Sequence, residues 1–108
     1  MDEFILAFVT TSSKEEAEKI AKRLVDAKAA PCINIIPSCV SIYEWQGKIS
    51  KDEESLMIIK SRKDSFPKIK ETVESLHSYD VPEVIAVPVG DISEKYRSYL
   101  EGFFADAE

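Results

Sequence analysis

The segment "CINIIPSCVSIYEWQGKISKDEESLMIIKS" at residues 32–61 determines the fold, because it encodes two long extended stretches joined by one short turn. Apolar residues alternate with polar and aromatic ones through residues 40–43, which is the period of two that is typical of a β-strand. Gly47 allows a tight reversal, and the apolar run at residues 55–61 forms the returning strand. We therefore predict a β-hairpin whose first strand spans residues 32–45.

A strand and a helix are expected before this hairpin. The apolar run at residues 4–9 is typical of a strand that is covered on both faces. The pairs Ser12/Glu15 and Ser13/Glu16 that follow each have the spacing of a helix capping box. A helical apolar stripe comes next and indicates an amphipathic helix. The stripe consists of Ala17, Ile20, Ala21, Leu24 and Val25.

A second helix, a fourth strand and a last helix are expected after the hairpin. Asp64 or Ser65 should cap the second helix, and Pro67 fits its first turn, where a missing N–H costs nothing. The run at residues 83–89 predicts a strand, and its Pro88 places that strand at a sheet edge or a bulge. The last helix is expected within residues 90–104. The residues predicted to face inward from the two helices are Phe66, Ile69, Val73 and Leu76, then Ile92, Tyr96, Tyr99, Leu100 and Phe103.

The order β-α-β-β-α-β with a terminal helix predicts an α+β fold, a ferredoxin-like sandwich of the split βαβ type. We expect a single domain over residues 1–108, because this length suits one domain and the sequence shows no repeat. One feature does not suit a monomer, since a first hairpin strand of about 13 residues far exceeds the usual length of about 5–6. The extended β-hairpin should project beyond the helices and expose Tyr43 and Trp45, which predicts oligomerisation.

Composition excludes several kinds of partner. The net charge of −6 argues against a nucleic-acid partner, because affinity for phosphate backbones comes from clustered Lys and Arg. The N-terminal apolar run is too short for a secretion signal or a membrane span, so we expect a cytoplasmic protein with no membrane partner. Cys32 and Cys39 would lie about 23 Å apart along one strand, too far for a disulfide, and are expected to be free thiols.

The sequence contains no recognisable catalytic motif. Its three glycines form neither a phosphate-binding loop nor a dinucleotide fingerprint, and there is no Gly-x-Ser-x-Gly elbow. We therefore expect no enzymatic activity. The single histidine, His77, ends the predicted second helix, and two interpretations of it stay open. It either caps the helix by binding terminal carbonyls, or joins neighbours such as Tyr79 and Glu83 in a metal site that another chain completes.

Four segments in this order resemble the CutA family, the divalent-cation-tolerance proteins, and together they cover nearly the whole chain. They are "PCINIIP", "SIYEWQGKI", "DEESLMIIKS" and "HSYDVPEVIAVPV". The resemblance implies a ferredoxin-like subunit in a homotrimer similar to the PII signalling proteins. It also implies a non-enzymatic role in divalent-cation tolerance, with copper binding in some members. The alternative is a PII-like regulatory module that acts through protein–protein contacts.

The resemblance further implies a ligand cleft between subunits. The candidate cleft residues are Tyr43, Trp45, Glu54, Lys60, Tyr79 and Glu83. His77 is the candidate ligand for a divalent metal ion such as Cu or Zn, and a small anion beside Lys60 is the other ligand considered. Copper-binding members are thought to use a cysteine after the first strand and two adjacent histidines. This chain has Thr11 and the pair Leu76/His77 at the corresponding positions.

Overall fold

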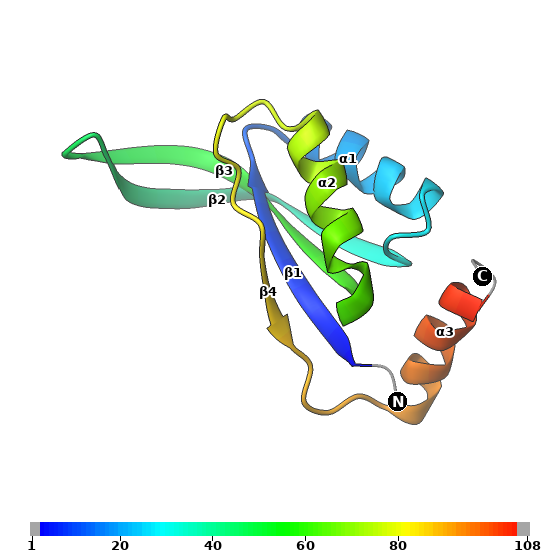
Figure 1. The fold of residues 1–108 in the computed structure, drawn as a ribbon. Coiled ribbons are helices and arrows are strands. Elements are labelled where there is room, and N and C mark those ends of the chain that lie inside the picture. The colour runs from blue at the N-terminus through cyan, green and yellow to red at the C-terminus, as the bar shows by residue number, and fades with distance from the viewer. Residues whose placement is uncertain (1–2, 106–108) are drawn as a thin grey trace.

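The computed structural model describes residues 3–105, which form an antiparallel four-stranded sheet with strand order β2-β3-β1-β4 (Figure 1). Its elements are β1 (Phe4–Thr11), α1 (Lys14–Asp26), β2 (Cys32–Trp45), β3 (Lys48–Arg62), α2 (Phe66–Leu76), β4 (Ile85–Pro88) and α3 (Glu94–Ala105). This order confirms the predicted ferredoxin-like fold with an extended hairpin and a terminal helix. No helix within residues 3–105 is long and apolar enough to cross a membrane.

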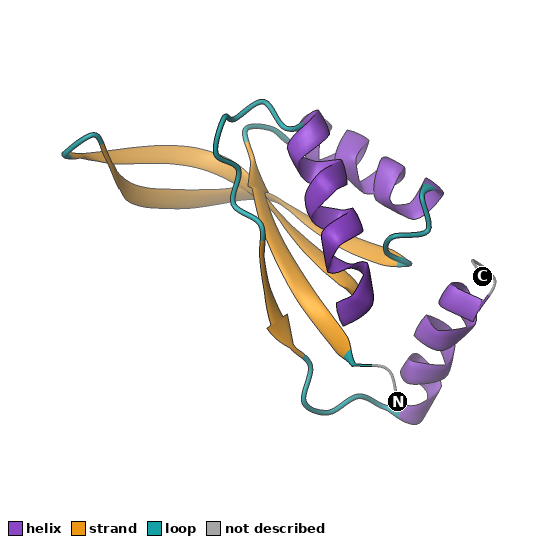
Figure 2. Cartoon of the chain, viewed as in Figure 1, coloured by secondary structure: helices purple, strands orange, loops and turns teal. Residues whose placement is uncertain are grey.

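Helices α1 and α2 cover one face of the sheet and form the core with it (Figure 2). Residues of the predicted stripes supply that core, because their helical spacing turns them toward the strands. Val25 is an exception, since it is 37% exposed at the margin of the α1 stripe. The fully buried members of this core are Ala7, Val9, Ala17, Ile20, Leu24, Ala29, Ala30, Met57, Ile59, Ile69 and Val73.

The two covering helices begin differently. Ser13 caps α1, because its Oγ accepts a hydrogen bond from the backbone N–H of Glu16 at 3.1 Å. The predicted side-chain cap of α2 is wrong, since Ser65 makes no such bond and a 3-10 turn (Lys63–Ser65) leads directly into the helix. Pro67 does lie in the first turn of α2, as its missing N–H allows.

The hairpin of β2 and β3 extends well beyond the helix-covered part of the sheet (Figure 1). A two-residue loop joins the strands, and its residues Gln46 and Gly47 both have positive φ, at 51° and 80°. Positive φ at both positions is the type I′ turn, whose twist matches that of the strands. β3 begins directly after this turn, so it is longer than the predicted return strand. Its residues 48–54 have no neighbour in β1, which ends at Thr11 opposite Ser55.

A bulge in β2 marks the point where the hairpin leaves the sheet. Ile36 pairs with Leu56 and Cys39 pairs with Glu54, so Pro37 and Ser38 together oppose Ser55. The Ser55 hydroxyl donates to the carbonyl of Pro37 at 3.0 Å. The extra residue shifts the alternation by one, because paired residues point to the same face. Beyond the bulge, odd-numbered residues of β2 therefore continue the face that even-numbered residues hold before it.

β4 is a short strand at the free edge of the sheet, and this confirms the predicted position of Pro88. The backbone N–H of Val89 donates to the carbonyl of Phe4 at 2.9 Å. Hydrogen-bonded pairs alternate in an antiparallel ladder. The backbone N–H and C=O groups of Val87 and Ile85 therefore also point toward β1, whereas the backbone groups of Ala86 and Pro88 point away from it. Proline therefore stands where its missing N–H removes a donor from the free edge and none from the ladder.

The sheet face opposite α1 and α2 is covered only at one end, by α3. Two cation–π contacts place the helix there, with Arg62 4.3 Å from the Phe104 ring and Arg97 5.0 Å from the Phe4 ring. The predicted inward stripe of α3 is partly wrong, because Leu100 and Phe104 are buried whereas Tyr96 and Tyr99 are exposed. Apolar side chains along the rest of this face are exposed or half-buried, and we call them the open face. They are Leu6, Phe8, Ile36, Leu56, Ile58, Ile85 and Val87.

Replacing Ile20 by Ala tests the assignment of the core. The variant is expected to lose about 2–5 kcal/mol of unfolding free energy, because the fully buried side chain would leave a cavity. Val25→Ala in the same helix is the matched control and should lose less than about 1 kcal/mol. Urea denaturation followed by circular dichroism measures both losses. Equal losses in the two variants would contradict the packing described for α1.

Candidate functional site

The root of the hairpin holds a buried carboxylate with a tyrosine partner. Glu54 is the first residue of β3 beyond the end of β1, and only 8% of it is exposed. The hydroxyl of Tyr79, from the turn after α2, donates to Glu54 Oε2 at 2.8 Å. Burial and then this bond raise the pKa of Tyr79 above its ordinary value, because ionised tyrosine would face a carboxylate. The pair fills the space that β1 leaves empty.

His77 holds the turn that presents Tyr79. Its Nε2 lies 2.7 Å from the carbonyl oxygen of Thr10 at the end of β1, and its Nδ1 accepts the backbone N–H of Tyr79 at 3.0 Å. The centroids of the His77 imidazole ring and the Tyr79 phenol ring lie 4.7 Å apart. The structure differs from the prediction that the His77 side chain caps α2 by binding its terminal carbonyls. The backbone N–H of His77 closes α2 by donating to Val73, while the imidazole bonds a strand carbonyl rather than a helix carbonyl.

Glu16 ties the same turn to α1. Its Oε2 accepts the backbone N–H of Ser78 at 2.9 Å, and its Oε1 accepts the backbone N–H of Ser12 at 3.1 Å. Burial alone would raise the pKa of Glu16, but hydrogen bonds from Ser78 and Ser12 lower it below its ordinary value. One carboxylate thus joins the start of α1 to the turn after α2.

The remaining hairpin residues of the predicted cleft lie farther out. The Tyr43 hydroxyl donates to Asp52 halfway along the hairpin, and this bond is the main cause that raises the pKa of Tyr43. Trp45 pairs with Lys48 beside the turn and is 56% exposed. Lys48 and Glu54 are six residues apart in β3, so the tip lies about 20 Å from the root at about 3.3 Å per residue.

Lys60 and Glu83 lie apart from the hairpin root. Lys60 is six residues beyond Glu54 in β3, and its Nζ is 3.8 Å from Cys32 Sγ near the end that α3 covers. Glu83 is exposed in the segment that leads to β4. Within one chain the structure thus brings together Glu54, Tyr79 and His77, but not the whole predicted set. The cleft between subunits stays a prediction.

In the described part of the chain, the possible donor side chains do not gather into a metal site. Within residues 3–105 no group of three or more His, Cys, Asp or Glu side chains is close enough to hold a metal ion. Cys32 and Cys39 are both free, as predicted, and pair with different parts of β3. The hydroxyl of Thr11, where the resemblance places the cysteine of copper-binding members, donates to the carbonyl of Ser13 at 2.7 Å.

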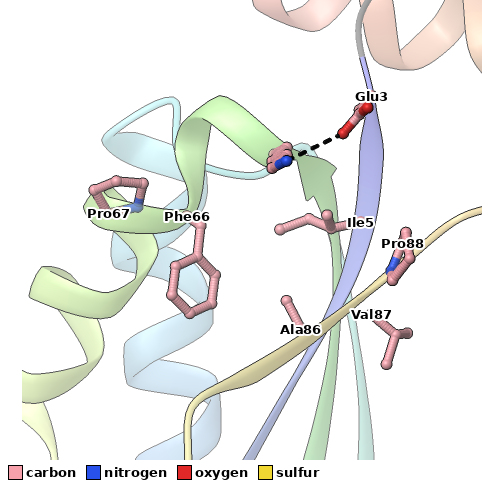
Figure 3. Close-up of a pocket in the computed structure, with 8 residues that line it drawn as sticks. Glu3, Ile5, Phe66, Pro67, Ala86, Val87 and Pro88 are labelled. Carbon is pink, nitrogen blue, oxygen red and sulfur yellow. Dashed lines mark ion pairs between the residues drawn. The ribbon is translucent and has the colours of Figure 1, made fainter.

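A separate hollow of about 520 Å³ lies on the helix side of the β4 edge (Figure 3). Its walls are mainly apolar, and an ion pair with an N–O distance of 3.4 Å joins Lys63 and Glu3 at its rim. None of the seven residues predicted for the cleft or the metal lines it. The apolar wall residues are Ile5, Phe66, Pro67, Ala86, Val87 and Pro88.

Comparison with known proteins decides the family. Residues 5–102 match the family described as "CutA1 divalent ion tolerance protein". The chain belongs to the CutA family. The family predicted from the four sequence segments is thereby confirmed, together with the association with divalent-cation tolerance that its name carries.

Individual CutA proteins are similar along most of this chain. It is 43% identical to the divalent-cation tolerance protein CutA of Thermus thermophilus, over 93% of this chain and 95% of that protein. It is also 43% identical to the chloroplastic protein CutA of Arabidopsis thaliana, over 90% of this chain and 53% of that protein, so it spans about half of the plant protein. The crystal structure of CutA1 from Oryza sativa matches with a TM-score of 0.90 and 39% identity, covering 94% of this chain and 93% of the rice chain.

Sequence reasoning missed two contributors to the hairpin root, Thr10 and Glu16, and one residue farther along the hairpin, Asp52. Thr10 acts through its backbone carbonyl, for which a side-chain pattern gives no signal. Glu16 was assigned to a capping box, and nothing in that motif indicates its second bond to Ser78. No motif singles out Asp52, although the two-residue turn at Gly47 fixes a register that brings it near Tyr43.

Tyr79→Phe tests the bond at the hairpin root. The variant should lose about 1 kcal/mol of unfolding free energy, because Glu54 loses its donor and the half-exposed site lets water replace part of it. Tyr43→Phe is the matched control, whose exposed bond to Asp52 should contribute little. Chemical denaturation at pH 7 measures both. A control that loses as much as Tyr79→Phe would contradict a special role for the root.

The same variant changes the response to alkali. Folding raises the pKa of Tyr79 above the ordinary value of 10.0, so its contribution to stability is complete below that pH and is lost as the pH rises beyond it. Wild type should therefore lose stability more steeply above pH 10 than Tyr79→Phe does. Parallel losses in the two proteins would show that the tyrosine does not titrate at a raised pKa.

Proposed function

We propose that this CutA protein is a non-enzymatic, cytoplasmic homotrimer that binds a divalent cation or a small anion in clefts between its subunits. The open face is the observation that supports this proposal most directly. Family membership supports the link to divalent cations, since relatives are named for tolerance to them. The two free thiols suit a reducing compartment, which supports the cytoplasm for this chain.

The open face and the hairpin supply the surface that assembly needs. Ile85 is 55% exposed and Trp45, beside the hairpin turn, is 56% exposed, although both are large apolar residues. Isolated exposed apolar residues are normal, but here they continue along one sheet face into a projecting hairpin. A closed ring of identical subunits would bury such a face in every copy and leave none uncovered.

Assembly also explains why the predicted cleft is incomplete in one chain. The hairpin root with Glu54 and Tyr79 lies about 20 Å from both Lys60 and the tip with Trp45, at about 3.3 Å per strand residue. A hairpin from a neighbouring subunit would bring Trp45 or Lys60 of a second copy toward that root. In this proposal, the cleft walls and the charged groups come from different chains.

Ile85→Lys tests the assembly. Wild type should show the mass of a trimer in multi-angle light scattering, and the variant should shift to monomer, because a lysine would be buried without a partner in the interface. Val25→Lys is the matched control, since Val25 is partly exposed at the margin of the α1 stripe, on the helix side of the sheet, and its variant should stay trimeric. A wild-type monomer mass would refute the proposed homotrimer.

Calorimetry with Zn(II) and with Cu(II) tests the ligand. Both ions should give binding heat with wild type and almost none with the Ile85→Lys monomer, because no described part of one chain gathers three ligands. Phosphate should be titrated in parallel as the small anion. Heat with phosphate alone would favour the anion, and the absence of heat with all three ligands would remove the ligand-binding role.

A PII-like regulatory role is the second candidate. The hairpin tip favours it, because Ile42 and Ile49 are both exposed on the hairpin face opposite Tyr43 and Trp45. If these residues stay exposed in the trimer, they offer a small apolar surface to another protein. Ile42→Ser with Ile49→Ser should then leave the trimer mass unchanged and remove only that contact.

A further inference from the structure

Both ring nitrogens of His77 are bound to backbone groups, and this fixes the protonation of the ring. The Thr10 carbonyl, 2.7 Å from Nε2, can only accept a hydrogen bond, so Nε2 carries a proton. The Tyr79 backbone N–H, 3.0 Å from Nδ1, can only donate, so Nδ1 carries the free electron pair. The ring is therefore the neutral Nε2–H tautomer.

We infer that His77 is a positioning residue that holds Tyr79 against Glu54, and that it is not the metal ligand which the family resemblance implies. All the contacts that carry this inference lie within one chain. It therefore stands or falls independently of the proposed trimer and of the ligand in its clefts.

The bonds of the turn act in series. The ring of His77 is fixed to β1 through Thr10, and its Nδ1 fixes the backbone of Tyr79 two residues later. The tilted ring contact, with 4.7 Å between centroids, sets the direction of the Tyr79 side chain. Its hydroxyl then reaches the buried Glu54 at 2.8 Å. Losing the bond between Nδ1 and the backbone N–H of Tyr79 therefore frees the bond to Glu54.

A second anchor keeps the turn from adjusting to a change at His77. Ser78 lies between His77 and Tyr79, and its backbone N–H donates to Glu16 Oε2 at 2.9 Å. Three successive residues are thus bound to three different elements, namely β1, α1 and β3. Because His77, Ser78 and Tyr79 are each held by a different element, the turn has little freedom to present Tyr79 to Glu54 from another position.

A metal ion at His77 would compete directly with this arrangement. A ligating imidazole gives the metal its one free electron pair, which here already accepts the N–H of Tyr79. The residues around it offer little in return, since Leu76 has no donor atom and the Thr11 hydroxyl donates to Ser13 at 2.7 Å. Binding would thus release Tyr79 from Glu54, and residues 3–105 of one chain offer no group of three or more ligands in return.

Nitrogen NMR of the full chain tests the inference, and a single histidine makes the spectrum unambiguous. With ¹⁵N-labelled histidine, the expected spectrum at pH 7.5 shows a protonated Nε2 and an unprotonated Nδ1. One equivalent of Zn(II) should leave both nitrogen signals unshifted. The opposite tautomer, or a shift of Nδ1 on adding Zn(II), would overturn the inference without any substitution in the protein.

Two variants separate positioning from general damage to the fold. In His77→Asn the side-chain oxygen can still accept the N–H two residues later, as asparagine does in turns, whereas His77→Leu has no acceptor. The readout is the ¹³Cζ signal of Tyr79, assigned with Tyr79→Phe. It should stay near its wild-type position in the Asn variant and move to that of a free tyrosine in the Leu variant. An unmoved signal in the Leu variant, or equal movement in both, would refute the role of Nδ1.

Discussion

The register of β2 against β3 is the constraint on which the rest of the molecule depends. Two residues, Pro37 and Ser38, oppose the single Ser55, and the extra residue reverses which side chains of β2 face the helices. Without it, Ile33 and Ile35 could still pack on the core, but Tyr43 and Trp45 would point to the helix side of the hairpin. The bulge therefore allows one strand to pack on the core at one end and to place Tyr43 and Trp45 on the side of the open face at the other.

The end of β1 creates the second constraint. β1 stops at Thr11 and pairs with β4 only as far as Phe8. The Thr10 carbonyl, on the β4 side, and the Glu54 carboxylate, beyond the end of β1, therefore need donors that no strand supplies. The turn after α2 supplies them from His77 and Tyr79. The candidate site thus arises where the fold must satisfy exposed strand-end groups. The hydrogen bonds of this site therefore stabilise the fold.

Local patterns predicted most of the fold and little of the site. The alternation in β2, the stripe of α1 and the edge position of Pro88 follow from the period and backbone chemistry of each segment alone. The α3 stripe failed in part, because Tyr96 and Tyr99 have the helical spacing of a core but lie past the edge of the surface that Leu100 and Phe104 cover. The partners of His77 could not be predicted, since they are backbone groups brought near only by the packing of separate elements.

Pro88 has a consequence for how copies of this protein can meet. A strand that approaches the free edge of β4 finds a usable N–H at Ala86 and none at Pro88. A partner strand can therefore add only a short run of bonds, and it gains nothing by sliding one step along. With so few backbone hydrogen bonds on offer, the edge pairs only with a strand that other contacts have already aligned. Such an edge favours finite rings and disfavours the open-ended stacking of sheets that leads to fibrils.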